Sequence, residues 1–72
     1  MKKKHPFPDM LNSEISAVID EVIHDERDRK LMKRRLCDGV FFEPLAEEFG
    51  LSTQRVKSIY SKYIGKLSKH IK

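Results

Sequence analysis

Apolar residues recur along this chain at helical spacing, in segments separated by short polar stretches. In the first segment they occupy positions i, i+4, i+7, i+8, i+11 and i+12, namely Leu11, Ile15, Val18, Ile19, Val22 and Ile23. Asn12 or Ser13 is suited to cap the start of this helix with its side chain. The pattern predicts a leading amphipathic helix with its apolar face toward the core.

A second helix follows after a polar interruption. Asp25 is suited to cap its start, since a carboxylate can accept from the free N–H groups of a first turn. The inner face of this helix presents Leu31, Met32 and Leu36. Gly39 supplies a left-handed stop after it.

The third predicted helix is short. Pro44 suits its first turn, where a missing N–H costs no hydrogen bond. Leu45, Ala46 and Phe49 are expected to turn inward, and Gly50 ends the helix.

The fourth predicted helix begins after a capping Ser52 and has two chemically distinct sides. Its apolar side carries Val56, Ile59, Tyr60, Tyr63, Leu67 and Ile71. Its polar side carries Gln54, Arg55, Lys57, Ser58, Ser61, Lys62 and Lys69. Gly65 lies within the helix at a cost of about 0.5 to 1 kcal/mol relative to alanine, so we expect bending or fraying beyond it.

These segments together predict an all-α fold. No segment alternates at the period of a strand, and no Asn-Gly hairpin signal occurs. We expect a small four-helix domain over residues 10–72 that includes a helix-turn-helix at 43–60. Residues 1–9 lack periodicity and are interpreted as a flexible basic arm.

The length restricts the possible functions. A chain of 72 residues and 8.5 kDa forms one domain, which hides only about 60% of the surface that its unfolded form exposes. This excludes a two-domain enzyme, a solenoid of several repeats and a full dinucleotide-binding fold. The apolar runs are far shorter than the roughly 20 residues of a membrane span, and no secretion signal is present. We therefore expect a cytoplasmic protein without a membrane partner.

No catalytic or metal chemistry is indicated. The single cysteine, Cys37, and the scattered His5, His24 and His70 lack the spacing of a metal site, so neither a metal nor a cofactor is expected. Glu47 and Glu48 are interpreted as surface charges, because no nucleophile or phosphate-binding glycine loop accompanies them. The chain is not expected to be an enzyme.

The charge is distributed unevenly along the chain. The net charge is +4, yet residues 53–72 hold six basic residues and no acidic one. A segment of this kind is the electrostatic signature of a surface that meets phosphate. The basic run over 29–35 is interpreted more simply, as a solvated helix face.

The segment 45–59 has the layout of a helix-turn-helix. Ala46 allows the close contact of two crossing helices, and Gly50 can adopt the positive φ of a tight turn. This geometry leaves the beginning of the second helix protruding, so its side chains can reach base edges in a major groove about 12 Å wide. The side chains concerned are Thr53, Gln54, Arg55, Lys57 and Ser58.

On these residues the chain resembles region four of the bacterial sigma factors, the part that reads the upstream promoter element. The likeness extends over about residues 26–67 and is strongest over 45–52 and 54–59. It implies a recognition helix in the major groove, with Gln54, Arg55, Lys57 and Ser58 facing bases or nearby phosphates. It also implies that Lys62 contacts the DNA backbone and that Arg27 and Arg35 grip flanking phosphates.

The chain departs from this family at several positions. Phe41 stands where the family usually has a threonine that caps a helix and touches phosphate, and Pro44 replaces a common glutamate. Thr53 and Gln54 replace an arginine and a glutamate, so we expect a different target sequence, with Gln54 suited to adenine. No segment resembles region two, which implies a free-standing module of the type found in phage and mobile elements of Gram-positive bacteria.

The main expectation is a nucleoid-associated, sequence-specific DNA-binding regulator of transcription that binds double-stranded DNA through Arg27, Arg35, Thr53, Gln54, Arg55, Lys57, Ser58, Ser61 and Lys62. The alternative is a module that docks on RNA polymerase without reading DNA. A homodimer through the apolar side of the first helix is a third possibility. A helical hairpin with no nucleic-acid role also stays open. Phe41, Phe42, Tyr60 and Tyr63 are interpreted as core residues.

Overall fold

The computed structural model describes residues 7 and 9–71, and its secondary structure is entirely helical within that part of the chain. The four helices are α1 (Asn12–Val22), α2 (Glu26–Leu36), α3 (Phe42–Phe49) and α4 (Thr53–Ile71). The predicted all-α class and the number of helices are confirmed. Most of the predicted basic arm over 1–9 lies outside the described residues, as do His5 and Lys72.

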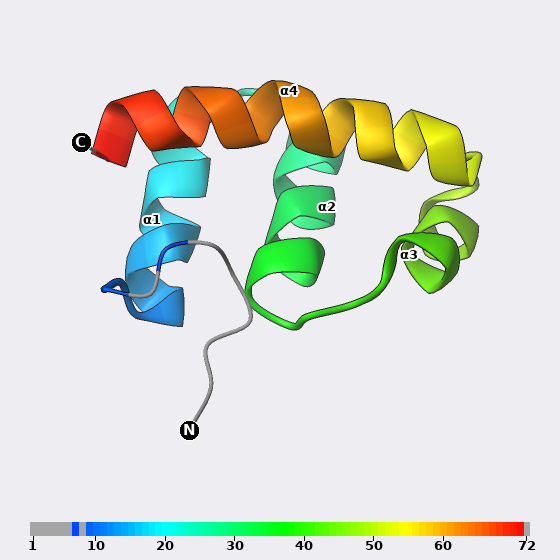
Figure 1. Cartoon of the computed structure of the whole chain (residues 1–72), viewed down its shortest axis with the longest axis horizontal. Helices are drawn as coiled ribbons and strands as arrows, with labels where there is room; N and C mark the ends of the chain where they lie inside the picture. The colour runs from blue at the N-terminus through cyan, green and yellow to red at the C-terminus, as the bar shows by residue number, and fades with distance from the viewer. Residues whose placement is uncertain (1–6, 8, 72) are drawn as a thin grey trace.

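The longest helix, α4, organises the packing. It crosses the other three helices, with α3 near its N-terminal end, α2 near its middle and α1 toward its C-terminal end (Figure 1). Twelve buried apolar residues form the core, and every helix contributes to it: Ile15, Ile19, Ile23, Leu31, Met32, Leu36, Leu45, Ala46, Val56, Ile59, Tyr63 and Leu67. The predicted inner faces therefore form one continuous core.

Local sequence signals set most of the helix ends. The side chain of Asp25 accepts a hydrogen bond from the backbone N–H of Asp28 at 3.0 Å, as predicted for the start of α2. Gly39, after the end of α2, has the predicted left-handed conformation with a φ of 71°.

The predicted cap of α1 was wrong. Leu11 holds the capping position, and its backbone N–H donates to Glu14 Oε1 at 2.8 Å. Asn12 instead donates from Nδ2 to the carbonyl oxygen of Cys37, and the Cys37 thiol donates to the carbonyl oxygen of Asn12. The start of α1 is thus tied to the end of α2, a contact between segments 25 residues apart that local capping rules do not include.

Two further expectations need correction. Phe41 was predicted to fill the core, but 75% of its surface is exposed at the position that precedes α3. The predicted fraying at Gly65 is not seen, since α4 continues through it to Ile71. Buried Leu67 and a polar contact of 3.2 Å between His70 Nε2 and Glu21 Oε1 hold the end of α4 against the rest of the fold.

Within residues 7 and 9–71, no helix has both the length and the apolar character needed to cross a bilayer.

Candidate nucleic-acid interface

The chain turns a sharp corner between α3 and α4. Gly50 adopts the left-handed conformation there, with a φ of 66°. The backbone N–H of Leu51 donates to the carbonyl oxygen of Ala46 at 2.8 Å, and that of Gly50 donates to Glu47 at 3.3 Å. These two bonds form the glycine-ended turn that satisfies the last carbonyl groups of a helix. The predicted end of α3 at Gly50 is confirmed.

The start of α4 is fixed in the same corner. Ser52 Oγ accepts a hydrogen bond from the backbone N–H of Arg55 at 3.1 Å, which confirms the predicted cap. Behind the corner, the side chains of Leu45, Ala46 and Val56 are buried. This packing fixes the orientation of α4 relative to α3 and leaves the opposite side of α4 free.

The predicted DNA-contact residues of α4 lie on its free side. Six of the seven that lie on α4 are exposed: Gln54, Arg55, Lys57, Ser58, Ser61 and Lys62. Thr53, the seventh, is half-buried at the first turn. By helical spacing, Thr53 and Lys57 share the edge of this face beside α3, whereas Arg55 and Lys62 share the opposite edge. The structure thus brings all seven onto one surface.

The basic side chains of α2 are nearly all engaged by carboxylates. Lys33 pairs with Asp20 at 2.8 Å, and Arg34 pairs with Glu48 and with Asp38 at 3.0 Å each. Two longer ion pairs complete the set, Arg29 with Asp20 at 4.0 Å and Lys30 with Glu26 at 3.7 Å. The hydrogen bonds that Arg34 donates to Glu48 and Asp38 raise the pKa of its guanidinium. Four of the five cations in the run over 29–35 are therefore neutralised by neighbouring acids.

The cations of α4 differ from those of α2 in this respect. Within the described part of the chain, none of Arg55, Lys57, Lys62, Lys66 and Lys69 lies within 4.0 Å of a carboxylate oxygen. No acidic residue occurs anywhere in α4. Among the described residues, the cations without a carboxylate partner are thus concentrated on this helix.

Arg35, predicted to contact phosphate, lies beside the α3 edge of this surface. Its guanidinium stacks over the ring of Phe42 at 4.4 Å and donates to the carbonyl oxygen of Val40 at 3.1 Å. The Nζ of Lys57 lies 5.9 Å from the centre of the same ring. The Phe42 ring in turn packs edge-on against Tyr60, with the ring centres 5.4 Å apart. Arg35 and Lys57 are therefore gathered around one aromatic pair.

Arg27 lies near the opposite edge of α4. It pairs with Asp28 at 3.1 Å, and the hydroxyl of Tyr63 donates to the other oxygen of Asp28 at 2.8 Å. Lys62 Nζ lies 5.2 Å from the centre of the Tyr63 ring. Burial, followed by the hydrogen bond to Asp28, raises the pKa of Tyr63. Asp28, which is itself buried, thus links an arginine of α2 to the middle of α4.

Arg27 and Arg35 therefore flank the exposed face of α4, one near each edge. Arg35 and Lys57 both contact the ring of Phe42. Arg27 contacts Asp28, which accepts from Tyr63, and the Tyr63 ring contacts Lys62. An elongated anion would meet cations on both sides of the exposed face.

Two residues near this surface were missed by sequence reasoning. Lys66 Nζ lies 5.8 Å from the Tyr63 ring, on the same edge as Lys62. The spacing of four residues between Lys62 and Lys66 was the signal that could have identified it. Phe41 was assigned to the core, but it lines a surface pocket together with Thr53 and Lys57.

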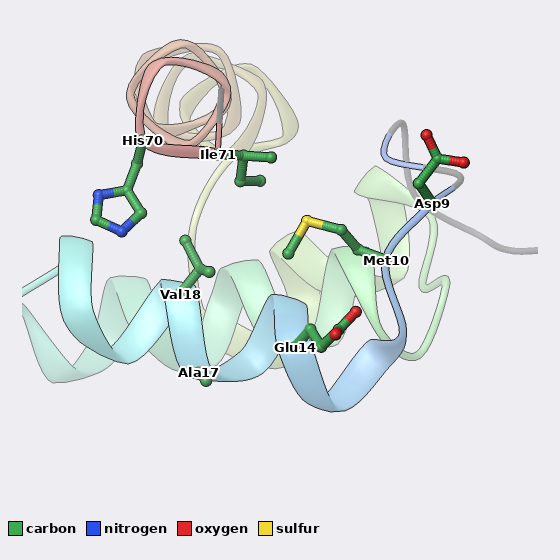
Figure 2. A pocket seen from close by; sticks show the side chains of 7 residues that line it. All are labelled: Asp9, Met10, Glu14, Ala17, Val18, His70 and Ile71. Carbon is green, nitrogen blue, oxygen red and sulfur yellow. The ribbon is translucent and has the colours of Figure 1, made fainter.

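A separate groove lies between α1 and the C-terminal end of α4. Figure 2 shows Met10, Val18 and Ile71 turned toward this groove, with His70 at one end of it. Val18 and Ile71 are half-buried, whereas the fully buried isoleucines of α1 face the core. The apolar side of α1 is thus mostly used for folding, and part of it remains at the surface.

Comparison of the chain with protein-family models, curated proteins and solved structures found no match. In the described residues, no group of three or more His, Cys, Asp and Glu side chains is placed to hold a metal ion.

Proposed function

We propose that this protein is a sequence-specific DNA-binding regulator of transcription. In this proposal α3, the corner at Gly50 and α4 act as a helix-turn-helix, with α4 lying in the major groove from about Thr53 onward. An α-helix fits the width of that groove. The layout proposed is similar to region four of sigma factors.

The observation that carries this proposal is the contrast between the cations of α2 and α4. Carboxylates engage five of the six arginine and lysine residues of α2, whereas the arginine and lysine residues of α4 have no carboxylate partner in the described chain. Like charges left together on one helix repel each other, and an external polyanion relieves that repulsion. Double-stranded DNA supplies such an anion as two rows of phosphates along a groove of helical width.

The exposed residues suit different parts of a duplex. The amide of Gln54 can pair with adenine through two hydrogen bonds, and Arg55 can pair with guanine in the same way. Lys57 and Lys62, on opposite edges of the face, would reach the two phosphate rows. Arg27 and Arg35 retain N–H groups beyond those used within the protein and would contact phosphates farther out. These last contacts would set register without reading sequence.

The direct test is selection of bound duplexes from a random pool at ~150 mM salt, where exposed charges farther apart than about 8 Å are largely screened. An enriched motif is expected. With about five phosphates neutralised, the logarithm of affinity should fall with the logarithm of salt concentration with a slope near −4.5. A pool that stays unenriched, together with a slope near zero, would refute the proposal.

Matched variants locate the reading surface. Lys57→Ala and Arg55→Ala should each weaken binding to the selected duplex, by about 1 to 3 kcal/mol where the side chain contacts a base. Lys30→Ala is the control, because Lys30 is equally exposed but is paired with Glu26 on α2. Equal effects of Lys57→Ala and Lys30→Ala would show that general charge, and not α4, determines binding.

A second candidate function is docking on RNA polymerase, and the groove between α1 and α4 is the observation that favours it. Ala17 lines this groove and is exposed, so Ala17→Arg would obstruct it without disturbing the core. If the groove binds the flap of RNA polymerase, Ala17→Arg should no longer capture that flap in a pull-down, whereas it should still bind the selected duplex. Sedimentation over a concentration series tests the related possibility of a homodimer, which would appear as a concentration-dependent mass.

A further inference from the structure

Phe41 is a large apolar side chain that the fold does not use. Three quarters of its surface is exposed, and its ring contacts no other aromatic ring or cation in the described part of the chain. The neighbouring Phe42 provides the contrast, since it packs against Tyr60 and beneath Arg35. Core packing therefore explains Phe42 and leaves Phe41 unexplained.

Local stability does not explain Phe41 either. It holds the capping position of α3, where Ser, Thr, Asp or Asn would satisfy a free N–H of the first turn. No side-chain hydrogen bond caps α3, so this end of the helix is less stable than it would be with a good cap. The position thus carries a residue that helps neither the helix nor the core.

The surroundings of Phe41 indicate what its ring would contact. Phe41, Phe42 and Pro44 form the apolar part of a surface pocket, Thr53 and Lys57 form its wall on α4, and Glu43 also lines it. Arg35 lies over the Phe42 ring at the same place. The patch is therefore continuous with the α3 edge of the exposed α4 face, and two cations and one carboxylate border it. A fitting partner presents an anion directly beside a C–H surface.

We infer that Phe41 is an apolar DNA contact, packing against a thymine methyl group or the C–H face of a deoxyribose at the edge of the groove that α4 enters. This inference rests on the proposed function, because it requires α4 in the major groove. DNA places phosphates beside both kinds of C–H surface, and a thymine methyl in the major groove is a recognised target of apolar side chains. In the complex, Lys57 holds the phosphate and Phe41 covers the adjacent C–H surface.

The experiment compares Phe41→Ala, Phe41→Leu and Lys57→Ala on the selected duplex over a series of salt concentrations. Phe41→Ala should weaken binding about tenfold, because the variant loses the burial of the part of the ring that the DNA covers. Phe41→Leu should restore most of the loss. Neither Phe41 variant should change the salt slope, because an apolar contact releases no counterion, whereas Lys57→Ala should reduce its magnitude by about 0.9.

Modified DNA distinguishes a contact with a thymine methyl group from a contact with a deoxyribose. Deoxyuridine replaces each thymine of the selected duplex in turn, which removes only the methyl group. If a methyl is contacted, one replacement should cost about fourfold in affinity with the unmodified protein, the value for one buried carbon, and should cost nothing with Phe41→Ala. If every replacement is silent while Phe41→Ala still weakens binding, the contact is the deoxyribose.

Either pattern supports the inference, and unchanged affinity in Phe41→Ala would overturn it, even if the same side chain proved to bind another protein. Failure of the proposed function gives a different result, since the unmodified protein would then bind no duplex in any of these assays. Circular dichroism of each variant serves as the folding control. The exposure of Phe41 predicts no loss of helix in any of them.

Discussion

Two glycines of this chain should respond in opposite directions to the same substitution. Gly65→Ala is expected to stabilise the protein, and Gly50→Ala is expected to destabilise it. In both positions an added Cβ would meet no heavy atom within 4 Å, so steric clash contributes to neither result. The two variants differ only in the backbone conformation that receives the methyl group.

The magnitudes follow from that conformation. Gly65 lies in the interior of α4, where alanine is favoured over glycine by about 0.5 to 1 kcal/mol, chiefly because it restricts the unfolded chain. Gly50 has a φ of 66°, a left-handed conformation that costs a residue with a Cβ about 1 to 2 kcal/mol. The expected difference between the two variants is therefore about 1.5 to 3 kcal/mol.

Thermal unfolding followed by circular dichroism at the helix band measures both effects. In a domain of this size, 1 kcal/mol shifts the midpoint of thermal unfolding by about 4 to 8 °C. Gly65→Ala should therefore raise the midpoint by a few degrees, and Gly50→Ala should lower it by about twice as much. A midpoint for Gly65→Ala below that of the unmodified protein would refute the reasoning about α4. An unchanged midpoint for Gly50→Ala would show that the corner does not require a left-handed residue.

Three other outcomes are expected. Tyr63→Phe should lower the free energy of unfolding by about 1.5 to 3 kcal/mol, as for a lost hydrogen bond to a charged group, whereas the control Tyr60→Phe removes a hydroxyl that makes no hydrogen bond to the described residues. Burial and the hydrogen bond to Asp28 raise the pKa of Tyr63, so the stability that its hydroxyl contributes is complete below pH 10.0 and is lost as pH rises through the folded-state pKa. Urea titrations should therefore show a smaller decrease in the free energy of unfolding at alkaline pH for Tyr63→Phe than for the unmodified protein. Burial, followed by the charge of Asp38, raises the pKa of the Cys37 thiol, so iodoacetamide should alkylate the folded protein more slowly than the urea-unfolded chain at pH 8. Arg27→Ala should weaken selected and random duplexes equally in a binding titration, and a loss confined to the selected duplex would contradict its assignment as a phosphate contact.

The sequence was sufficient for features that depend on neighbouring residues. Asp25 and Ser52 cap their helices through bonds to a residue three positions away, and Gly50 ends α3 by its own conformational freedom. The exposed face of α4 was equally predictable, because helical spacing alone separates its polar residues from Val56 and Tyr63. Each of these features is determined by residues within a few positions of one another in the sequence.

Features that depend on contacts between distant segments could not be predicted in this way. Asn12 bonds to Cys37 and is not a cap, and the buried Asp28 accepts a hydrogen bond from Tyr63, 35 positions away. Phe41 and Phe42 are chemically identical neighbours, yet only the second meets Tyr60 and Arg35. Single-residue properties do not distinguish such alternatives, because the deciding partner is known only once the helices have packed.

Net charge alone understates the candidate site for the same reason, since contacts between distant segments decide which cations are paired. Residues 29–35 and the last helix are both strongly basic in sequence, and the structure separates them by what lies opposite each one. Packing of α1 and α3 against α2 brings Asp20 and Glu48 to the α2 cations, whereas no carboxylate of the described residues lies within 4.0 Å of an arginine or lysine of α4. Among the described residues, the cations without a carboxylate partner therefore lie mainly on α4, which a count of charges does not show. Asp20→Asn should test this point directly: it frees Lys33 and Arg29, and duplex binding should then become stronger for random sequences and less selective. Unchanged binding to random duplexes would show that pairing with Asp20 does not keep these α2 cations from contributing.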